Sequence, residues 1–218
     1  LLNAGADVNI GSECINHPLI PAIHNVRILK LLLKFGARVN ICNRRGVTAL
    51  SEASRFGYID VVKILIEYGA YVNVADYEGC TPLYHACAEG HEDIVRVMID
   101  SGAYVNNAMY RFDGSSFLSV VMNDSGYNVN IIKTLIESGV YINKPDFYGF
   151  TPFMNAVIGY DEDTNRYDES QLEIIKLLLR GGADVYAKNY KGLSAFDMVP
   201  EELIEFLQQL IECCKTTC

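Results

Sequence analysis

The sequence contains no long hydrophobic run. None of its apolar stretches approaches the roughly eighteen uninterrupted residues of a membrane-spanning helix, which excludes such a helix. Positive charge is also scarce, since 18 Lys and Arg face 27 Asp and Glu and the formal net charge is −9. That balance argues against non-specific nucleic-acid binding. Because half of the 218 residues are hydrophobic and 21% are charged, the composition excludes a disordered chain and fits a soluble folded protein.

Signatures of catalysis and of metal binding are missing as well. The sequence contains no GxGxxG, GxxxxGK[ST], HExxH or GxSxG motif, and its four histidines show no metal-ligand spacing. Cys80 and Cys87 flank His85 and superficially suggest a Cys/His nucleophile pair, but no third, orienting group is evident. We therefore expect no catalytic residue, no cofactor and no metal site.

The cysteines and the first residues of the sequence indicate in which cellular compartment the protein is expected. Seven cysteines, an odd number without a CxxC pair, are typical of a reduced intracellular protein with buried thiols. Residue 1 is Leu, and no signal-peptide pattern follows it. We expect a cytoplasmic protein and a chain that begins inside a longer polypeptide.

A short motif of the form Gly-small-x-Val/Ile-Asn recurs along the chain. It occurs as GADVN at 5–9, GARVN at 36–40, GAYVN at 69–73, GAYVN at 102–106 and GVYIN at 139–143, with a degenerate GADVY at 182–186. The leading glycines are separated by 31, 33, 33, 37 and 43 residues. A basic period of 33 residues, with insertions in the later copies, indicates a repeat architecture.

A second motif and a helical pattern complete each repeat. The second motif reads GVTAL at 46–50, GCTPL at 79–83, GSSFL at 114–118, GFTPF at 149–153 and GLSAF at 192–196. Its Thr, with Pro82 or Pro152 next, predicts the start of a helix. Apolar pairs at helical spacing, such as Val61, Val62 and Leu65, predict a second helix that ends at the glycine of the next first motif.

This combination of a 33-residue period, TPL and GAxVN motifs and two helices per repeat resembles the ankyrin repeat family. The resemblance covers almost the whole chain and implies an all-α repeat solenoid, with a β-turn or hairpin and an antiparallel helix pair in each repeat. We expect a single domain over residues 1–218. Its repeats are expected at 1–10 (partial), 11–41, 42–74, 75–107, 108–144, 145–187 with an insert near 160–170, and 188–218 as a C-terminal cap.

Three departures from the repeat pattern carry structural expectations. Pro18 and Pro21 predict an irregular first helix in the repeat at 11–41. The polar stretch at 159–170 predicts an exposed loop between two helices. In the cap, Leu203, Phe206 and Leu207 are expected to face inward, together with other apolar residues of 203–211.

The resemblance also implies where a partner protein would bind, because members of this family bind proteins on a concave wall of turn tips and first helices. In the register of this sequence, the candidate partner-binding residues are Arg44, Arg45, Arg55, Phe56, Tyr77, Glu78, Glu89, Phe112, Asp113, Asp124, Phe147, Tyr148, Phe150, Tyr190 and Lys191.

Aromatic residues recur at the predicted tips, where polar residues are usual. Such rings could anchor a partner, since aromatic side chains offer large contact areas at low conformational cost. They could equally lie on neighbouring turns and stabilise the stack. Charge is uneven too: residues 1–60 hold seven Lys or Arg against four Asp or Glu, a net of +3 within an acidic chain. Such asymmetry can orient a partner.

The sequence thus predicts a monomeric, non-catalytic protein-interaction module that binds another protein and neither nucleic acid nor membrane. The alternative is a targeting or regulatory arm of a larger enzyme or effector whose catalytic domain lies outside these residues.

Overall fold

The computed structural model forms two compact units, Leu1–Tyr104 and Val105–Cys218, which are called the N-terminal and the C-terminal unit. Each unit is described by itself. The structure describes residues 7–9, 17–106, 116–124, 128–159 and 166–216.

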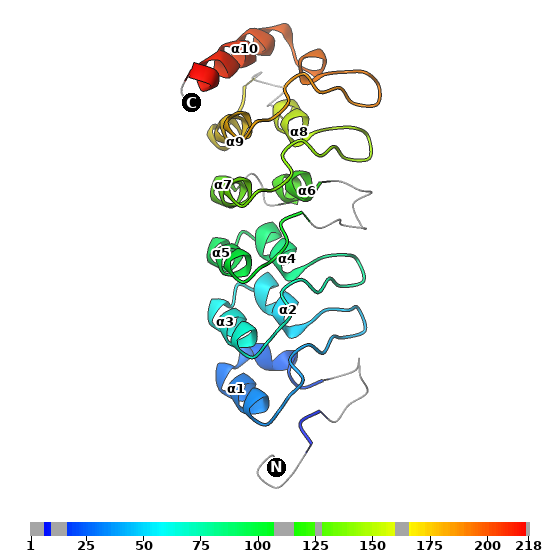
Figure 1. The fold of residues 1–218 in the computed structure, drawn as a ribbon, viewed down its shortest axis with the longest axis vertical. Helices are drawn as coiled ribbons and strands as arrows, with labels where there is room; N and C mark the ends of the chain where they lie inside the picture. The colour runs from blue at the N-terminus through cyan, green and yellow to red at the C-terminus, as the bar shows by residue number, and fades with distance from the viewer. Residues whose placement is uncertain (1–6, 10–16, 107–115, 125–127, 160–165, 217–218) are drawn as a thin grey trace. The chain divides into compact units, whose positions relative to one another are not determined.

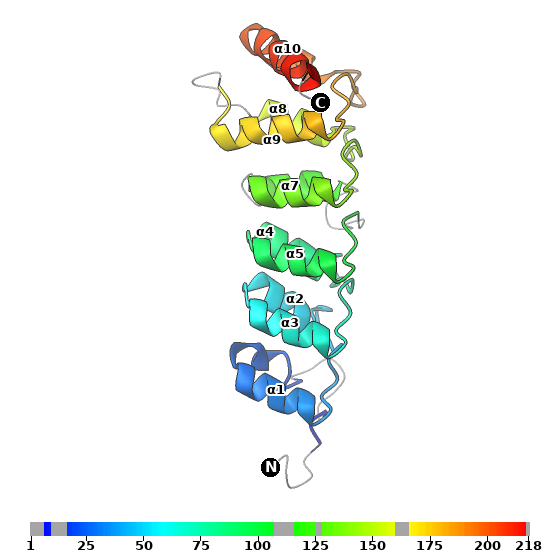
Figure 2. The same ribbon diagram turned by 60° about the vertical axis from the view of Figure 1, so that its left-hand side comes forward.

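The N-terminal unit consists of helix pairs joined by projecting hairpins (Figure 1). One row holds the first helices α2 (Ala49–Arg55) and α4 (Pro82–Ala88), which contact each other. The second row holds α1 (Val26–Lys34), α3 (Ile59–Glu67) and α5 (Glu92–Asp100), each in contact with the next (Figure 2). The expected irregular first helix is confirmed, since Pro21–His24 form the short 3-10 helix η2 ahead of α1.

The C-terminal unit repeats this arrangement. Its first helices are α6 (Phe117–Asp124) and α8 (Pro152–Ile158), and its second helices are α7 (Val129–Glu137) and α9 (Glu169–Arg180). The 3-10 helix η4 (Ala195–Met198) packs on α8, and α10 (Glu201–Thr216) packs on α9. In the part of the chain that the structure describes there is no strand, and Cys42 and Thr48 of the N-terminal unit form an isolated bridge. The regular elements of both units are therefore helices, as the motifs predicted.

Helices form where the sequence supplies a cap and a buried face. Thr48, Thr81 and Thr151 are N-caps whose hydroxyl oxygens accept a hydrogen bond from the backbone N–H three residues on. On α3, Val62 and Leu65 are fully buried. Complete burial of one such side chain contributes roughly 1.5–3 kcal/mol, so these faces hold the helix pairs together.

An asparagine ladder connects each repeat to the next. The Asn73 Nδ2 atom donates to the carbonyl oxygen of Gly102 at 3.0 Å, and the backbone N–H of Tyr104 donates to Asn73 Oδ1 at 2.8 Å. The same two bonds recur at the Asn of every complete first motif. The ladder consists of Asn9, Asn40, Asn73, Asn106 and Asn143. This explains why the motif ends in Asn.

The cap and the insert differ in how well the sequence predicted them. Leu203, Leu207 and Ile211 of α10 are buried as expected, but the inward placement of Phe206 is wrong. Phe206 is 40% exposed and stacks on Tyr167 with ring centroids 6.2 Å apart. Residues 160–165 of the insert lie outside the described residues. Beyond them, the Tyr167 hydroxyl donates to the Val157 carbonyl oxygen at 3.0 Å and joins the end of the insert to α8.

Candidate functional site

Each described hairpin tip is closed by an Asn or Asp side chain. In the tip before α4, Asp76 Oδ1 accepts hydrogen bonds from the backbone N–H groups of Glu78 and Cys80, at 3.0 and 2.9 Å. Asn43, Asp146 and Asn189 make the same pair of bonds in their hairpins. Such local side-chain bonds fix a turn without help from neighbouring strands. The two residues after each Asn or Asp are therefore held at the outer end of a rigid turn.

In the tips closed by Asp76, Asp146 and Asn189, aromatic side chains occupy these outer positions and face solvent. Tyr77 is 73% exposed in the N-terminal unit, and Tyr190 is 75% exposed in the C-terminal unit. Phe147 and Tyr148 are adjacent and exposed, with their rings edge to face at a centroid distance of 5.7 Å. Exposed aromatic residues on a rigid turn are suited to contact a protein surface.

The same rings also pack on the preceding hairpin. A Cβ atom on Gly46 would lie 2.8 Å from Cδ1 of Tyr77, so the ring rests directly on that glycine. Tyr190 rests in the same way on Gly149. The backbone N–H of Tyr77 donates to the Arg45 carbonyl oxygen at 3.0 Å, and so ties the two hairpins together. The stacking role predicted for the tips is therefore present at Tyr77 and Tyr190, although most of each ring remains exposed.

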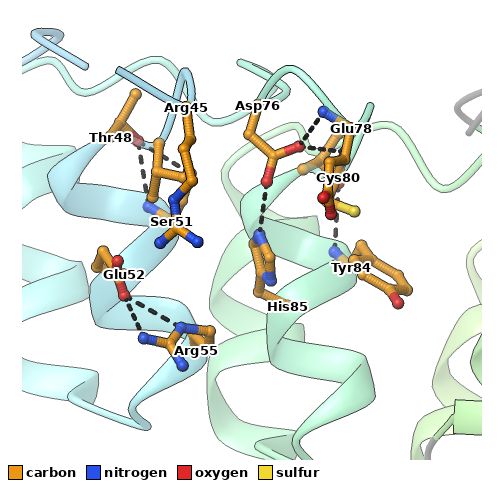
Figure 3. Close-up of polar contacts among 12 residues, drawn as sticks. Arg45, Thr48, Ser51, Glu52, Arg55, Asp76, Glu78, Cys80, Tyr84 and His85 are labelled. Carbon is orange, nitrogen blue, oxygen red and sulfur yellow. Dashed lines mark hydrogen bonds and ion pairs between the residues drawn. The ribbon is translucent and has the colours of Figure 1, made fainter. Parts of the chain in front are cut away.

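A groove of about 390 Å³ lies in the N-terminal unit between α2, α4 and their hairpins. We call it the α2–α4 groove (Figure 3). It is lined by Arg44, Arg45, Val47, Ser51, Glu52, Arg55, Asp76, Tyr77, Glu78 and His85. Five of the predicted partner-binding residues are thereby brought together, namely Arg44, Arg45, Arg55, Tyr77 and Glu78.

Asp76 joins the hairpin to the floor of the groove. Its Oδ1 closes the turn, and its Oδ2 lies 3.4 Å from His85 Nε2 on α4 (Figure 3). Burial lowers the pKa of His85 below its ordinary value of 6.5, and the neighbouring Asp76 carboxylate offsets this only in part. His85 is therefore neutral at pH 7 and adds no positive charge to the groove.

Glu52 and Arg55 form an ion pair on the α2 side. Glu52 Oε2 accepts from Arg55 Nε at 3.1 Å and from the Arg55 terminal nitrogen at 2.7 Å. The same guanidinium lies over the ring of Phe56, 4.2 Å from its centroid. Phe56 itself lies outside the groove, in an aromatic cluster with His24 and Tyr58. Arg55 is thus held in place by contacts within the chain.

The remaining predicted residues lie apart from this groove. Glu89 is exposed at the C-cap of α4. Phe147, Tyr148, Phe150, Tyr190 and Lys191 belong to tips of the C-terminal unit, where Phe150 is half-buried. Phe112 and Asp113 lie outside the described residues. Asp124 ends α6, but its side chain is outside the described part.

Sequence reasoning missed Ser51, Glu52, Asp76 and His85 as groove residues. The signal was available for two of them. Glu52 and His85 both stand four residues after the capping Thr of their repeats, on the face of the first helix that follows the tip. The role of Asp76 depends on its contact with His85, which no spacing rule predicts.

Metal-ligating side chains are not clustered in the described part of the chain, which holds no group of three or more His, Cys, Asp or Glu side chains that could bind a metal ion. Burial raises the pKa of the Cys87 thiol far above its ordinary range, so this cysteine is a protonated packing group. No helix within the described ranges is long and apolar enough to cross a membrane.

Comparison with protein families agrees with this architecture. A model described as ankyrin repeats in three copies matches residues 1–76 and 19–109, and a single ankyrin-repeat model matches residues 148–190. Together these matches cover more than half of the chain. The chain belongs to the ankyrin-repeat family, whose members are generally non-catalytic protein-interaction modules.

Two curated proteins share shorter stretches with the chain. A Plasmodium falciparum (isolate 3D7) protein named "Putative E3 ubiquitin-protein ligase" is 34% identical over 80 residues, which are 37% of this chain and 1% of that protein. A fowlpox virus (strain NVSL) protein named "Putative ankyrin repeat protein" is 44% identical over 64 residues, which are 29% of this chain and 11% of that protein. The chain therefore spans only a small part of either relative.

Proposed function

We propose that this chain is a non-catalytic module that binds a partner protein through its hairpin tips and first helices. The observation that carries the proposal is the set of exposed aromatic side chains on rigid turns, with Tyr77 beside the α2–α4 groove in the N-terminal unit. Aromatic residues dominate the energetics of many interfaces, and rings held on rigid turns present their contact area to a partner.

The preformed geometry of the tips supports the same function. The side chains of Asn43, Asp76, Asp146 and Asn189 fix the turns before any partner arrives. A partner therefore does not have to order these segments on binding, which reduces the entropic cost of association. In each unit the tip aromatics are the residues that we expect to contribute most to affinity.

Affinity capture from the source cell, read by mass spectrometry, tests this proposal. The tip variant Tyr77→Ser/Phe147→Ser/Tyr148→Ser should lose the captured partner because its exposed rings are gone. The matched control Tyr71→Ser/Tyr141→Ser/Tyr186→Ser also removes one exposed tyrosine from the N-terminal unit and two from the C-terminal unit. It should still capture the partner, because these tyrosines lie outside the tips.

The outcomes separate binding from stability. Thermal unfolding of both variants is measured beside the wild-type chain. Loss of capture by the tip variant alone, while that variant still folds and unfolds cooperatively, supports the proposal. Equal capture by all three proteins contradicts it, and so does a tip variant that no longer folds, since the rings would then be structural.

A second candidate function is that of a targeting arm within a larger enzyme or effector. The similarity to a stretch that makes up 1% of a Plasmodium protein named as a ubiquitin ligase favours it. In that case the surfaces described above would recruit a substrate or regulator for chemistry performed elsewhere in the polypeptide. Sequencing the full-length gene product tests this candidate, which requires a neighbouring catalytic domain.

A further inference from the structure

The carboxylates of the α2–α4 groove are already occupied by partners within the chain. Both Asp76 oxygens are in use, one by two backbone N–H groups and the other by His85. Glu52 accepts two hydrogen bonds from Arg55. Glu78 also has an interaction partner of its own. The carboxylates that line the groove are therefore held by contacts within the chain before a ligand arrives.

Two positive charges of the groove are not engaged. Arg44 and Arg45 are exposed, and within the described part of the chain neither guanidinium forms an ion pair. The backbone that carries them is fixed on both sides. The Arg45 N–H donates to Asn43 Oδ1 at 2.9 Å, and the Arg45 carbonyl oxygen accepts from Tyr77 N–H at 3.0 Å. The groove thus offers two guanidinium groups on a rigid turn.

Arg44 and Arg45 favour an anionic occupant on their side of the groove. Arg55, the third arginine of the lining, is balanced by Glu52. Residues 1–60 carry a net charge of +3 in a chain whose net charge is −9. Guanidinium groups bind carboxylates through paired hydrogen bonds, and such contacts set both the partner and its orientation.

We propose that the α2–α4 groove binds an acidic segment of a partner protein, with carboxylates of that segment contacting Arg44 and Arg45 and with apolar atoms packed on the Tyr77 ring. This inference rests on the proposed function, because it names the kind of partner that the same surface takes. It also explains why two adjacent arginines stand at this tip, where Tyr77 and Glu78 occupy the equivalent positions in the next repeat.

Selection from a library of random displayed peptides tests the inference on the whole chain. The wild-type protein should enrich peptides that carry at least two Asp or Glu residues. Arg44→Gln/Arg45→Gln should bind those peptides about 10-fold or more weakly, since a hydrogen bond between charged groups contributes at least that factor. The charge-matched control Arg27→Gln/Arg96→Gln removes two exposed arginines from α1 and α5 and should bind like the wild-type chain.

Salt dependence adds a second readout. Binding of the selected peptides by the wild-type chain should weaken as ionic strength rises, and the Arg44→Gln/Arg45→Gln variant should lose most of that dependence. Enrichment of peptides without acidic residues would overturn the inference and leave the proposed function standing. Equal binding by the two arginine variants, or no enriched peptide at all, would overturn it as well. The proposed function is judged separately by the tip variants in affinity capture.

Discussion

Gly46 offers a direct test of the contact between neighbouring hairpins. It has a φ of +79°, and a methyl group there would lie 2.8 Å from the Tyr77 ring and 3.0 Å from the Tyr77 backbone nitrogen. A left-handed backbone costs a non-glycine residue about 1–2 kcal/mol. Displacing the Tyr77 nitrogen also breaks its hydrogen bond to Arg45, which adds about 1 kcal/mol. Gly46→Ala should therefore destabilise the chain by about 2–3 kcal/mol.

Gly36→Ala is the matched control. Gly36 has a φ of +83°, but a methyl group there would meet no atom within 4 Å. The backbone strain alone should destabilise this variant, by about 1–2 kcal/mol. Urea unfolding of the two variants and the wild-type chain, followed by circular dichroism, gives the difference directly. Equal destabilisation by both substitutions would refute the claim that Tyr77 packs closely on the preceding hairpin.

Two further predictions concern the ladder and pH. Asn73→Ala removes the hydrogen bonds to Gly102 and Tyr104. Because both bonds are solvent-exposed, the free energy of unfolding measured by urea titration should fall by roughly 1–2 kcal/mol. An unchanged urea midpoint would show that the ladder does not stabilise the chain. Burial lowers the pKa of His85 in the folded chain, so below its ordinary value of 6.5 the unfolded chain binds more protons. Stability should therefore fall as the pH drops from about 6.5 towards the lowered pKa. His85→Gln should lose less stability between neutral and mildly acidic pH than the wild-type chain, and an equal loss would exclude His85 as a source of that pH dependence.

The helices could be predicted because their signals are local and recur. Apolar spacing on α3, with Val62 and Leu65 fully buried, reflects the geometry of a single helix. A capping Thr such as Thr81 acts on the N–H three residues away, so its effect is contained within a short segment. The period of 33 residues then places successive copies of the same local structure beside one another.

The groove could be predicted only in part, because its chemistry arises between repeats. Arg45 and Tyr77 were recognised as tip residues, but their shared hydrogen bond joins positions 32 residues apart. The sequence pattern does not reveal that His85 lies against Asp76. It also does not reveal the burial that lowers the pKa of His85. The wrong placement of Phe206 has a similar cause, since its contact with Tyr167 involves the irregular end of the insert.

Hydrogen exchange on the complex between the chain and its captured partner tests the central claim most directly. Binding through tips and first helices predicts slower exchange of the amides in the hairpin that carries Arg45, in the hairpin that carries Tyr77, and in α2 and α4. Exchange in the second helices α3 and α5 should remain unchanged. Protection confined to α3 and α5, with the tips exchanging as in the free chain, would contradict the account.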